Sequence, residues 1–113
     1  MKVRIKRMMA MEKIILEQLK DMLAKRFRLH KLIVFGSRAR GDADPDSDLD
    51  IVVILEDAPT EAERDYVSDC AWEAGLEHGI VIVPFVFDRG YWEKGPIRHS
   101  LFAKAVREEG VPV

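Results

Sequence analysis

The chain of 113 residues and 13.0 kDa is long enough for one hydrophobic core and too short for two, so we expect a single domain over residues 1–113. Its 48% hydrophobic and 34% charged residues are typical of a soluble globular protein and argue against a disordered chain, and no segment approaches the length of a membrane span. The single cysteine, Cys70, cannot form an intramolecular disulfide, which favours the cytoplasm.

The net charge of −2 conceals two segments of opposite charge. Residues 1–31 hold ten Lys and Arg against three acidic residues, and residues 42–73 hold twelve acidic residues against one Arg. Such a distribution indicates either solvated surfaces or charge-complementary contact with a partner protein. Because Phe27 is the one aromatic residue of the basic segment, a nucleic-acid interface is disfavoured.

The first part of the chain predicts a helix followed by a buried strand. Apolar residues recur at helical spacing over about residues 8–27, and charged residues such as Glu12 occupy the other face. The residues expected to face the core are Met11, Ile15, Leu19, Met22, Leu23 and Phe27. The run KLIVFG at residues 31–36 is short, β-branched and closed by glycine, and it therefore predicts a buried strand.

A second strand and a second helix are predicted next. The run DIVVIL at residues 50–55 has the same composition as the first strand. Thr60 and Glu63 have the spacing of a capping box, which predicts the start of a helix that ends near residues 78–79. Its expected inner stripe consists of Tyr66, Val67, Cys70, Ala71 and Ala74.

The last part of the chain predicts a third strand, a turn and a final helix. The strand is IVIVPFVF at residues 80–87, in which Pro84 favours a sheet edge or a bulge. A turn is expected at residues 91–96 and a helix over residues 97–109, before Gly110. This alternation predicts an α/β (α+β) fold with a small mixed central sheet flanked by helices.

Five aspartates alternate with other residues just before the second strand. They are Asp42, Asp44, Asp46, Asp48 and Asp50. An EF-hand calcium loop requires glycine at its sixth position, where Ser47, Leu49 or Ile51 stands in the three registers, so this kind of site is excluded. The first three aspartates lie among Gly, Ala, Pro and Ser, a composition that indicates an exposed loop.

Asp48 and Asp50 differ from the other three because they open the second strand. The strand period of two places both carboxylates on one face, about 7 Å apart. Like charges beside a buried run need a compensating cation, and Mg²⁺ binds carboxylates together with phosphate oxygens and water. Considered alone, the pair fits a charged strand end equally well.

Gly36 and Ser37 form a candidate phosphate-binding turn after the first strand. Glycine lets a phosphate approach the backbone, and a serine hydroxyl with the N–H groups of a helix start holds anionic oxygens. No G-K-[ST] follows, so this is not a Walker loop. Many turns share this composition, and the combination with Asp48 and Asp50 is what points to a nucleotide–Mg²⁺ site.

The Gly-Ser turn, ten intervening residues and Asp48-Leu49-Asp50 together resemble the signature of the minimal nucleotidyltransferases, in the DNA polymerase β-like superfamily. The resemblance implies the polymerase β-like nucleotidyltransferase fold and transfer of a nucleotide, AMP from ATP or a relative, to a hydroxyl acceptor. It implies Asp48 and Asp50 as catalytic ligands of Mg²⁺, two ions in all, and Gly36 and Ser37 as ligands of the phosphates. The remaining candidate nucleotide-binding residues are Arg38, Arg40 and Ser47.

One part of the family pattern is missing from this chain. The family supplies a third carboxylate from the next core strand, where this chain has Val81 and Val83 and no acid. Asp88, which follows that strand, is the candidate catalytic replacement, although a turn aspartate is the simpler interpretation. If Asp88 does not replace the third carboxylate, the resemblance implies nucleotide binding with weak transfer.

The small size resembles the antitoxin half of two-gene toxin–antitoxin modules, whose partner is a small helical HEPN-type protein. The resemblance implies adenylylation of that partner, and the alternative is a catalytically weak antitoxin that neutralises it by direct contact. Transfer to a small molecule or RNA, with the acceptor held by a separate subunit, is a further alternative. The aromatic residues available for an interface or for core packing are Trp72, Tyr91, Trp92 and Phe102.

Overall fold

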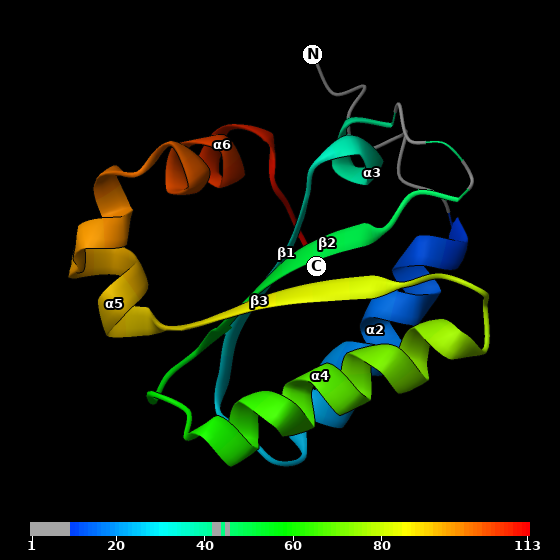
Figure 1. Cartoon of the computed structure of the whole chain (residues 1–113), viewed down its shortest axis with the longest axis horizontal. Coiled ribbons are helices and arrows are strands. Elements are labelled where there is room, and N and C mark those ends of the chain that lie inside the picture. The colour runs from blue at the N-terminus through cyan, green and yellow to red at the C-terminus, as the bar shows by residue number, and fades with distance from the viewer. Residues whose placement is uncertain (1–9, 42–43, 45) are drawn as a thin grey trace.

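The computed structural model describes residues 10–41, 44 and 46–113, which form a four-stranded sheet with helices on both faces (Figure 1). The strands are β1 (Leu29–Phe35), β2 (Leu49–Leu55), β3 (Ile82–Asp88) and β4 (Val111–Pro112). Their order is β3-β2-β1-β4, with β2 and β3 parallel and β1 antiparallel to both β2 and β4. The expected mixed sheet flanked by helices is therefore confirmed.

Helices α2 (Ala10–Ala24) and α4 (Glu61–Leu76) cover one face of the sheet (Figure 1). Their apolar stripes pack on the side chains of β1 and β2 in one cluster of buried residues. The prediction of α2 is confirmed, but the orientation predicted for two of its residues is wrong. Glu12 is only 3% exposed, whereas Met11 is 42% exposed. The buried stripe of α2 includes Leu16, which is one helical turn after Glu12, so the stripe is rotated away from Met11.

The capping box at the start of α4 is confirmed in both of its hydrogen bonds. The hydroxyl of Thr60 accepts from the N–H of Glu63 at 3.1 Å, and the carboxylate of Glu63 accepts from the N–H of Thr60 at 2.9 Å. The inner stripe is as predicted, with four members buried and Tyr66 partly buried. The helix ends at Leu76, slightly earlier than predicted.

Strand β3 is an edge strand, as Pro84 predicts. The N–H of Leu49 donates to the carbonyl of Val81, so the backbone groups of Val81, Val83 and every second residue thereafter face β2. The nitrogen of Pro84 therefore faces outward, where its missing N–H removes no bond of the sheet.

The second face of the sheet is covered by α5 (Arg89–Lys94), the 3₁₀ helix η1 (Pro96–His99) and α6 (Leu101–Glu109). The turn predicted at residues 91–96 is wrong over its first part, which belongs to α5. The last helix begins later than predicted, because the hydroxyl of Ser100 accepts from the N–H of Ala103 and starts a new helix there. β4 was not predicted and has only two residues.

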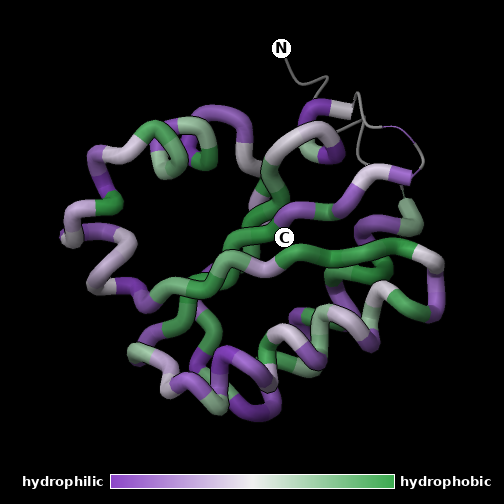
Figure 2. The backbone as a smooth tube through the Cα atoms, in the orientation of Figure 1, coloured by the Kyte–Doolittle hydropathy of each residue, from purple (hydrophilic) through white to green (hydrophobic). Residues whose placement is uncertain are grey.

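Hydropathy follows these layers, with apolar strands at the centre and polar segments in the outer helices and loops (Figure 2). None of the helices in the described part of the chain has both the length and the apolar character that crossing a membrane requires.

Candidate active site

The first half of the site is the turn between β1 and the short helix α3 (Ser37–Arg40). Gly36 has φ +79° and ψ −157°, a backbone conformation that is essentially restricted to glycine. The N–H of Arg40 donates to the carbonyl of Gly36 at 3.1 Å, and that of Gly41 to the carbonyl of Ser37 at 2.9 Å. The predicted glycine turn and short helix are therefore present.

The second half is the start of β2. Leu49 and Ile51 are buried against the layer of α2 and α4, so Asp48 and Asp50 lie on the opposite face of the sheet. Asp50 is half-buried and Asp48 is exposed. This alternation produces the predicted common face for the two carboxylates.

Strand pairing brings the two halves together. Phe35, which precedes Gly36, is the antiparallel partner of Asp50. A Cβ atom added to Gly36 would lie 3.1 Å from Oδ2 of Asp50, so the turn lies directly against that carboxylate. The absence of a side chain at Gly36 leaves room beside the carboxylate for a ligand oxygen.

Among the described residues, no cationic side chain is paired with either carboxylate. Burial, and secondarily the charge of Asp48, raise the pKa of Asp50 above its ordinary value. Two hard oxygen donors with uncompensated charge fit a divalent cation such as Mg²⁺.

A third protein ligand is not evident beside this pair. Among residues 10–41, 44 and 46–113, no group of three or more His, Cys, Asp or Glu side chains gathers as a metal site would require. Val83 is the residue of β3 that lies beside Asp50 in the parallel register. The position where a third carboxylate would adjoin Asp50 is therefore apolar.

Asp88, the candidate catalytic replacement, lies away from Asp48 and Asp50. It pairs with Leu55, whereas Val83 pairs with Asp50, so Asp88 lies five residues farther along the strand, about 17 Å away. Its carboxylate instead accepts from the N–H of Tyr91 at 3.0 Å and caps α5. The simpler interpretation, an aspartate that starts a local turn, is the one the geometry favours.

Arg38 is buried behind the turn and braces it. Its Nη1 donates to Oε2 of Glu12 at 2.7 Å, and its Nε and Nη2 donate to the carbonyl of Ser47 at 3.1 and 2.6 Å. Arg40 is exposed and donates to Glu109 at 3.1 Å, which links α3 to α6. The contacts in the structure thus favour bracing roles for both arginines.

Sequence reasoning missed Glu12 as a residue of this region. The signal was present, because Glu12 precedes the buried Leu16 by four positions and therefore lies on the same side of the helix. Of the first three aspartates, Asp42 lies outside the described residues, while Asp44 and Asp46 are exposed as predicted. The N–H of Ser47 donates to the carbonyl of Asp44 at 3.0 Å in the turn before β2.

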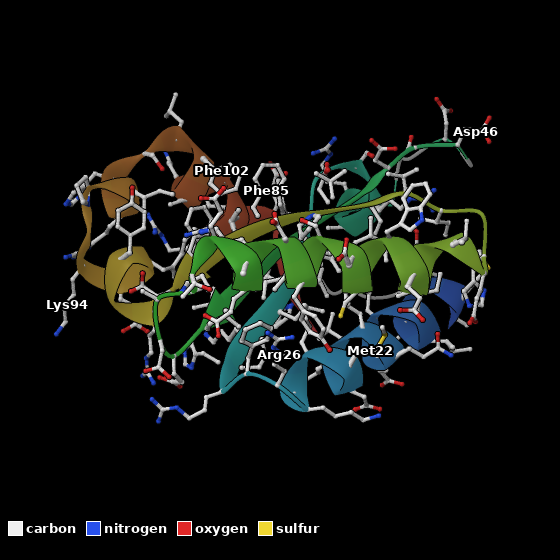
Figure 3. The ribbon with its side chains drawn as sticks, turned by 60° about the horizontal axis from the view of Figure 1, so that its bottom comes forward. Met22, Arg26, Asp46, Phe85, Lys94 and Phe102 are labelled. Carbon is white, nitrogen blue, oxygen red and sulfur yellow. The ribbon has the colours of Figure 1, made fainter. Side chains whose placement is uncertain are left out.

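Aromatic side chains form a cluster next to the carboxylates on the same face of the sheet. Phe35, Phe85 and Phe102 contact one another with ring centroids 5.3 to 5.5 Å apart, and Figure 3 shows Phe85 and Phe102 side by side. Trp92 is buried in the same cluster, so core packing accounts for it and for most of Phe102. Trp72 and Tyr91, at 59% and 44% exposed, remain available to a partner.

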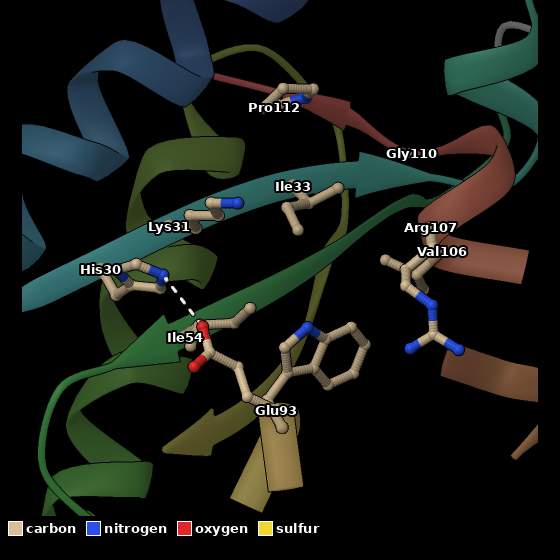
Figure 4. Close-up of a pocket in the computed structure, with 10 residues that line it drawn as sticks. His30, Lys31, Ile33, Ile54, Glu93, Val106, Arg107, Gly110 and Pro112 are labelled. Carbon is tan, nitrogen blue, oxygen red and sulfur yellow. Dashed lines mark ion pairs between the residues drawn. The ribbon is translucent and has the colours of Figure 1, made fainter. Parts of the chain in front are cut away.

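A cavity of about 280 Å³ lies farther along this face, between the sheet and the layer of α5 and α6 (Figure 4). His30 and Glu93 approach to 3.8 Å across it. The residues that line it are His30, Lys31, Ile33, Ile54, Trp92, Glu93, Val106, Arg107, Gly110 and Pro112. Asp48 and Asp50 do not border this cavity, so it is separate from the carboxylate site.

Comparisons with known proteins give a family and a fold. A family model described as a nucleotidyltransferase domain matches residues 16–107. A chain in a crystal structure of a toxin-antitoxin with AMP-PNP has a TM-score of 0.59 over 85% of this chain and 69% of its own length. At 18% identity that likeness is one of fold alone.

Two proteins of Methanocaldococcus jannaschii, both named Putative protein adenylyltransferase, are similar in sequence. One is 34% identical over 62 residues, 55% of this chain and 63% of its own length, so the match spans less than two thirds of that relative. The other is 38% identical over 85 residues, 75% of this chain and 78% of its own length.

Proposed function

Because the chain belongs to the nucleotidyltransferase domain family, we propose that it transfers AMP from ATP to a hydroxyl group of a partner protein. Asp48 and Asp50 bind Mg²⁺ in this proposal, and the turn at Gly36 and Ser37 binds the phosphates. The names of the two relatives, which contain the word adenylyltransferase, support AMP as the transferred group.

The observation that carries the proposal is the approach of the Gly36 turn to Asp50. The 3.1 Å between the position of a Cβ atom at Gly36 and Oδ2 of Asp50 means that a phosphate held at the turn lies within reach of a cation held by the carboxylate. Each half of the site is common by itself, whereas this juxtaposition is what a nucleotide–Mg²⁺ complex requires.

The residues of the chain contribute mainly position and charge. The acceptor hydroxyl gives up its proton to water, its oxygen forms a bond to the α-phosphorus as the bond to the bridging oxygen breaks, and pyrophosphate leaves with the electron pair. Mg²⁺, when bound, activates the acceptor hydroxyl and neutralises the leaving group. Asp48 and Asp50 would hold the Mg²⁺ ion at the start of β2, and the Gly36 turn orients the phosphates for in-line attack.

We propose an antitoxin role, with a small helical HEPN-type protein as the partner and acceptor. The similarity in fold to a chain in a toxin-antitoxin structure supports this role. The exposed Trp72 and Tyr91 are suitable contact residues for a protein partner.

A second candidate is an antitoxin that binds nucleotide and neutralises its partner by contact, with little transfer. Val83 beside Asp50 favours it, because an apolar side chain stands where a third carboxylate would bind metal or accept a proton. The two candidates share the same nucleotide site and differ in turnover.

Co-expression with the protein encoded by the adjacent gene separates the two candidates. Mass spectrometry of that protein is expected to show added adenylyl groups with the wild-type chain and none with the Asp48→Asn variant. An unmodified partner that is nevertheless bound and neutralised by the wild-type chain supports the second candidate and contradicts the first.

A further inference from the structure

Glu12 and Arg38 are the buried charged residues of the described part of the chain, with 3% and 7% of their surface exposed. Their ion pair is 2.7 Å long and joins α2 to α3. Burying two charges is unfavourable unless each is paired and hydrogen-bonded. The ion pair between Arg28 and Asp57 is also 2.7 Å long, but both of its side chains are exposed, so burial distinguishes the pair of Glu12 and Arg38 from it.

Arg38 also connects the two halves of the site. It follows Ser37 in the phosphate-binding turn, and its Nε and Nη2 donate to the carbonyl of Ser47 at 3.1 and 2.6 Å. Ser47 immediately precedes Asp48. One guanidinium group therefore spans from the turn after β1 to the backbone at the start of the metal-binding segment of β2.

Glu12 orients that guanidinium. With Nη1 donating to Glu12 and the Nε and Nη2 side donating to Ser47, the fork of Arg38 lies between α2 and the carbonyl of Ser47. The planar, fixed fork of arginine directs separate donors to both partners, whereas the three donors of lysine all lie on one compact ammonium group. The carboxylate also balances the charge of Arg38 in a buried setting.

We propose that Glu12 and Arg38 are positioning residues for nucleotidyl transfer, and this inference rests on the function proposed above. They set the separation between the phosphate-binding turn and Asp48. Groups that orient metal ligands without touching the metal are known to control metal affinity. The competing assignment is that Arg38 binds a phosphate directly, and the two assignments predict different results for conservative variants.

The test compares Glu12→Gln and Arg38→Lys with Arg28→Lys, which alters the exposed pair of the same length. All three are made in the full chain, and circular dichroism tests whether each is folded. Mn²⁺ affinity is measured by electron paramagnetic resonance, and affinity for a fluorescent ATP analogue is measured at saturating Mn²⁺. If Arg38→Lys does not fold, Glu12→Gln with Arg38→Met replaces it, because that double variant leaves no unpaired buried charge.

Positioning predicts that the variants at Glu12 and Arg38 each weaken Mn²⁺ binding about tenfold or more relative to Arg28→Lys. The analogue affinity at saturating Mn²⁺ is expected to change much less. Wild-type Mn²⁺ affinity in Glu12→Gln overturns the proposal, as does a loss confined to analogue affinity in Arg38→Lys. A wild-type chain that binds neither Mn²⁺ nor the analogue overturns the proposed function and this inference together.

Discussion

Substitution of Gly36 by alanine is the sharpest perturbation of the proposed site. Its backbone, at φ +79° and ψ −157°, lies in a region that other residues occupy at a cost of about 1–3 kcal/mol. At about 4 °C per kcal/mol for a domain of this size, we expect the melting temperature to fall by roughly 4–12 °C.

The same substitution also disturbs the carboxylate of Asp50, the proposed metal ligand. The added Cβ would lie 3.1 Å from Oδ2 of Asp50, closer than the ordinary contact distance of 3.4–4 Å, so the carboxylate must move by a few tenths of an ångström. We therefore expect Gly36→Ala to weaken Mn²⁺-dependent binding of an ATP analogue about tenfold or more, because displaced catalytic groups lose their required geometry.

Gly79→Ala is the matched control. Gly79 also has a positive φ, +69°, but a Cβ atom there would meet nothing within 4 Å among the described residues, so this variant is strained without touching the site. Thermal denaturation and analogue binding are measured for both variants. Wild-type binding in Gly36→Ala, or an equal loss of binding in Gly79→Ala, would refute the reasoning.

Three further predictions concern carboxylates and their absence. Because the pKa of Asp50 is raised in the folded state, its favourable contribution to stability is present below the unfolded pKa of about 3.9 and is lost as pH rises through the folded pKa. Asp50→Asn should therefore have a higher melting temperature than wild type at pH 7, and this difference should disappear in acid. Mg²⁺ should raise the melting temperature of wild type and not that of the variant. A variant that melts at the wild-type temperature at pH 7 contradicts the burial argument. Asp88→Ala should lose about 1 kcal/mol of stability because the cap of α5 is lost, and it should keep full transfer activity and metal affinity. A loss of transfer activity at unchanged metal affinity would instead assign Asp88 a catalytic role. Val83→Asp, which adds a carboxylate beside Asp50, should raise transfer by up to about 100-fold if a base is what the site lacks, and a rate no higher than wild type contradicts that idea.

Much of the fold could be predicted because its signals are local. The Thr60 capping box and the edge position imposed by Pro84 each depend on a few adjacent residues. The helix after β3 was not predicted, because residues 91–96 were interpreted as a turn; the carboxylate of Asp88 caps this helix, α5. β4 has too few residues to carry a pattern, and it exists because β1 offers it a free edge.

The candidate site likewise has parts that local sequence signals predict and parts that depend on tertiary packing. The Gly36 turn and the common face of Asp48 and Asp50 follow from spacing and strand period. Their proximity depends on the antiparallel register of β1 and β2, which the spacing alone does not determine. The pairing of Glu12 with Arg38 joins residues 26 positions apart and needed the packing of α2 against α3 to become visible.

The central claim is that Asp48 and Asp50 support transfer of AMP onto a protein. The most direct measurement incubates the purified chain, the protein of the adjacent gene and Mg²⁺ with ATP labelled at either the α- or the γ-phosphate. We predict that the partner retains the α-label and not the γ-label, and that both labels are absent with Asp48→Asn or Asp50→Asn. Labelling from the γ-phosphate, or α-labelling that survives both substitutions, would contradict the account.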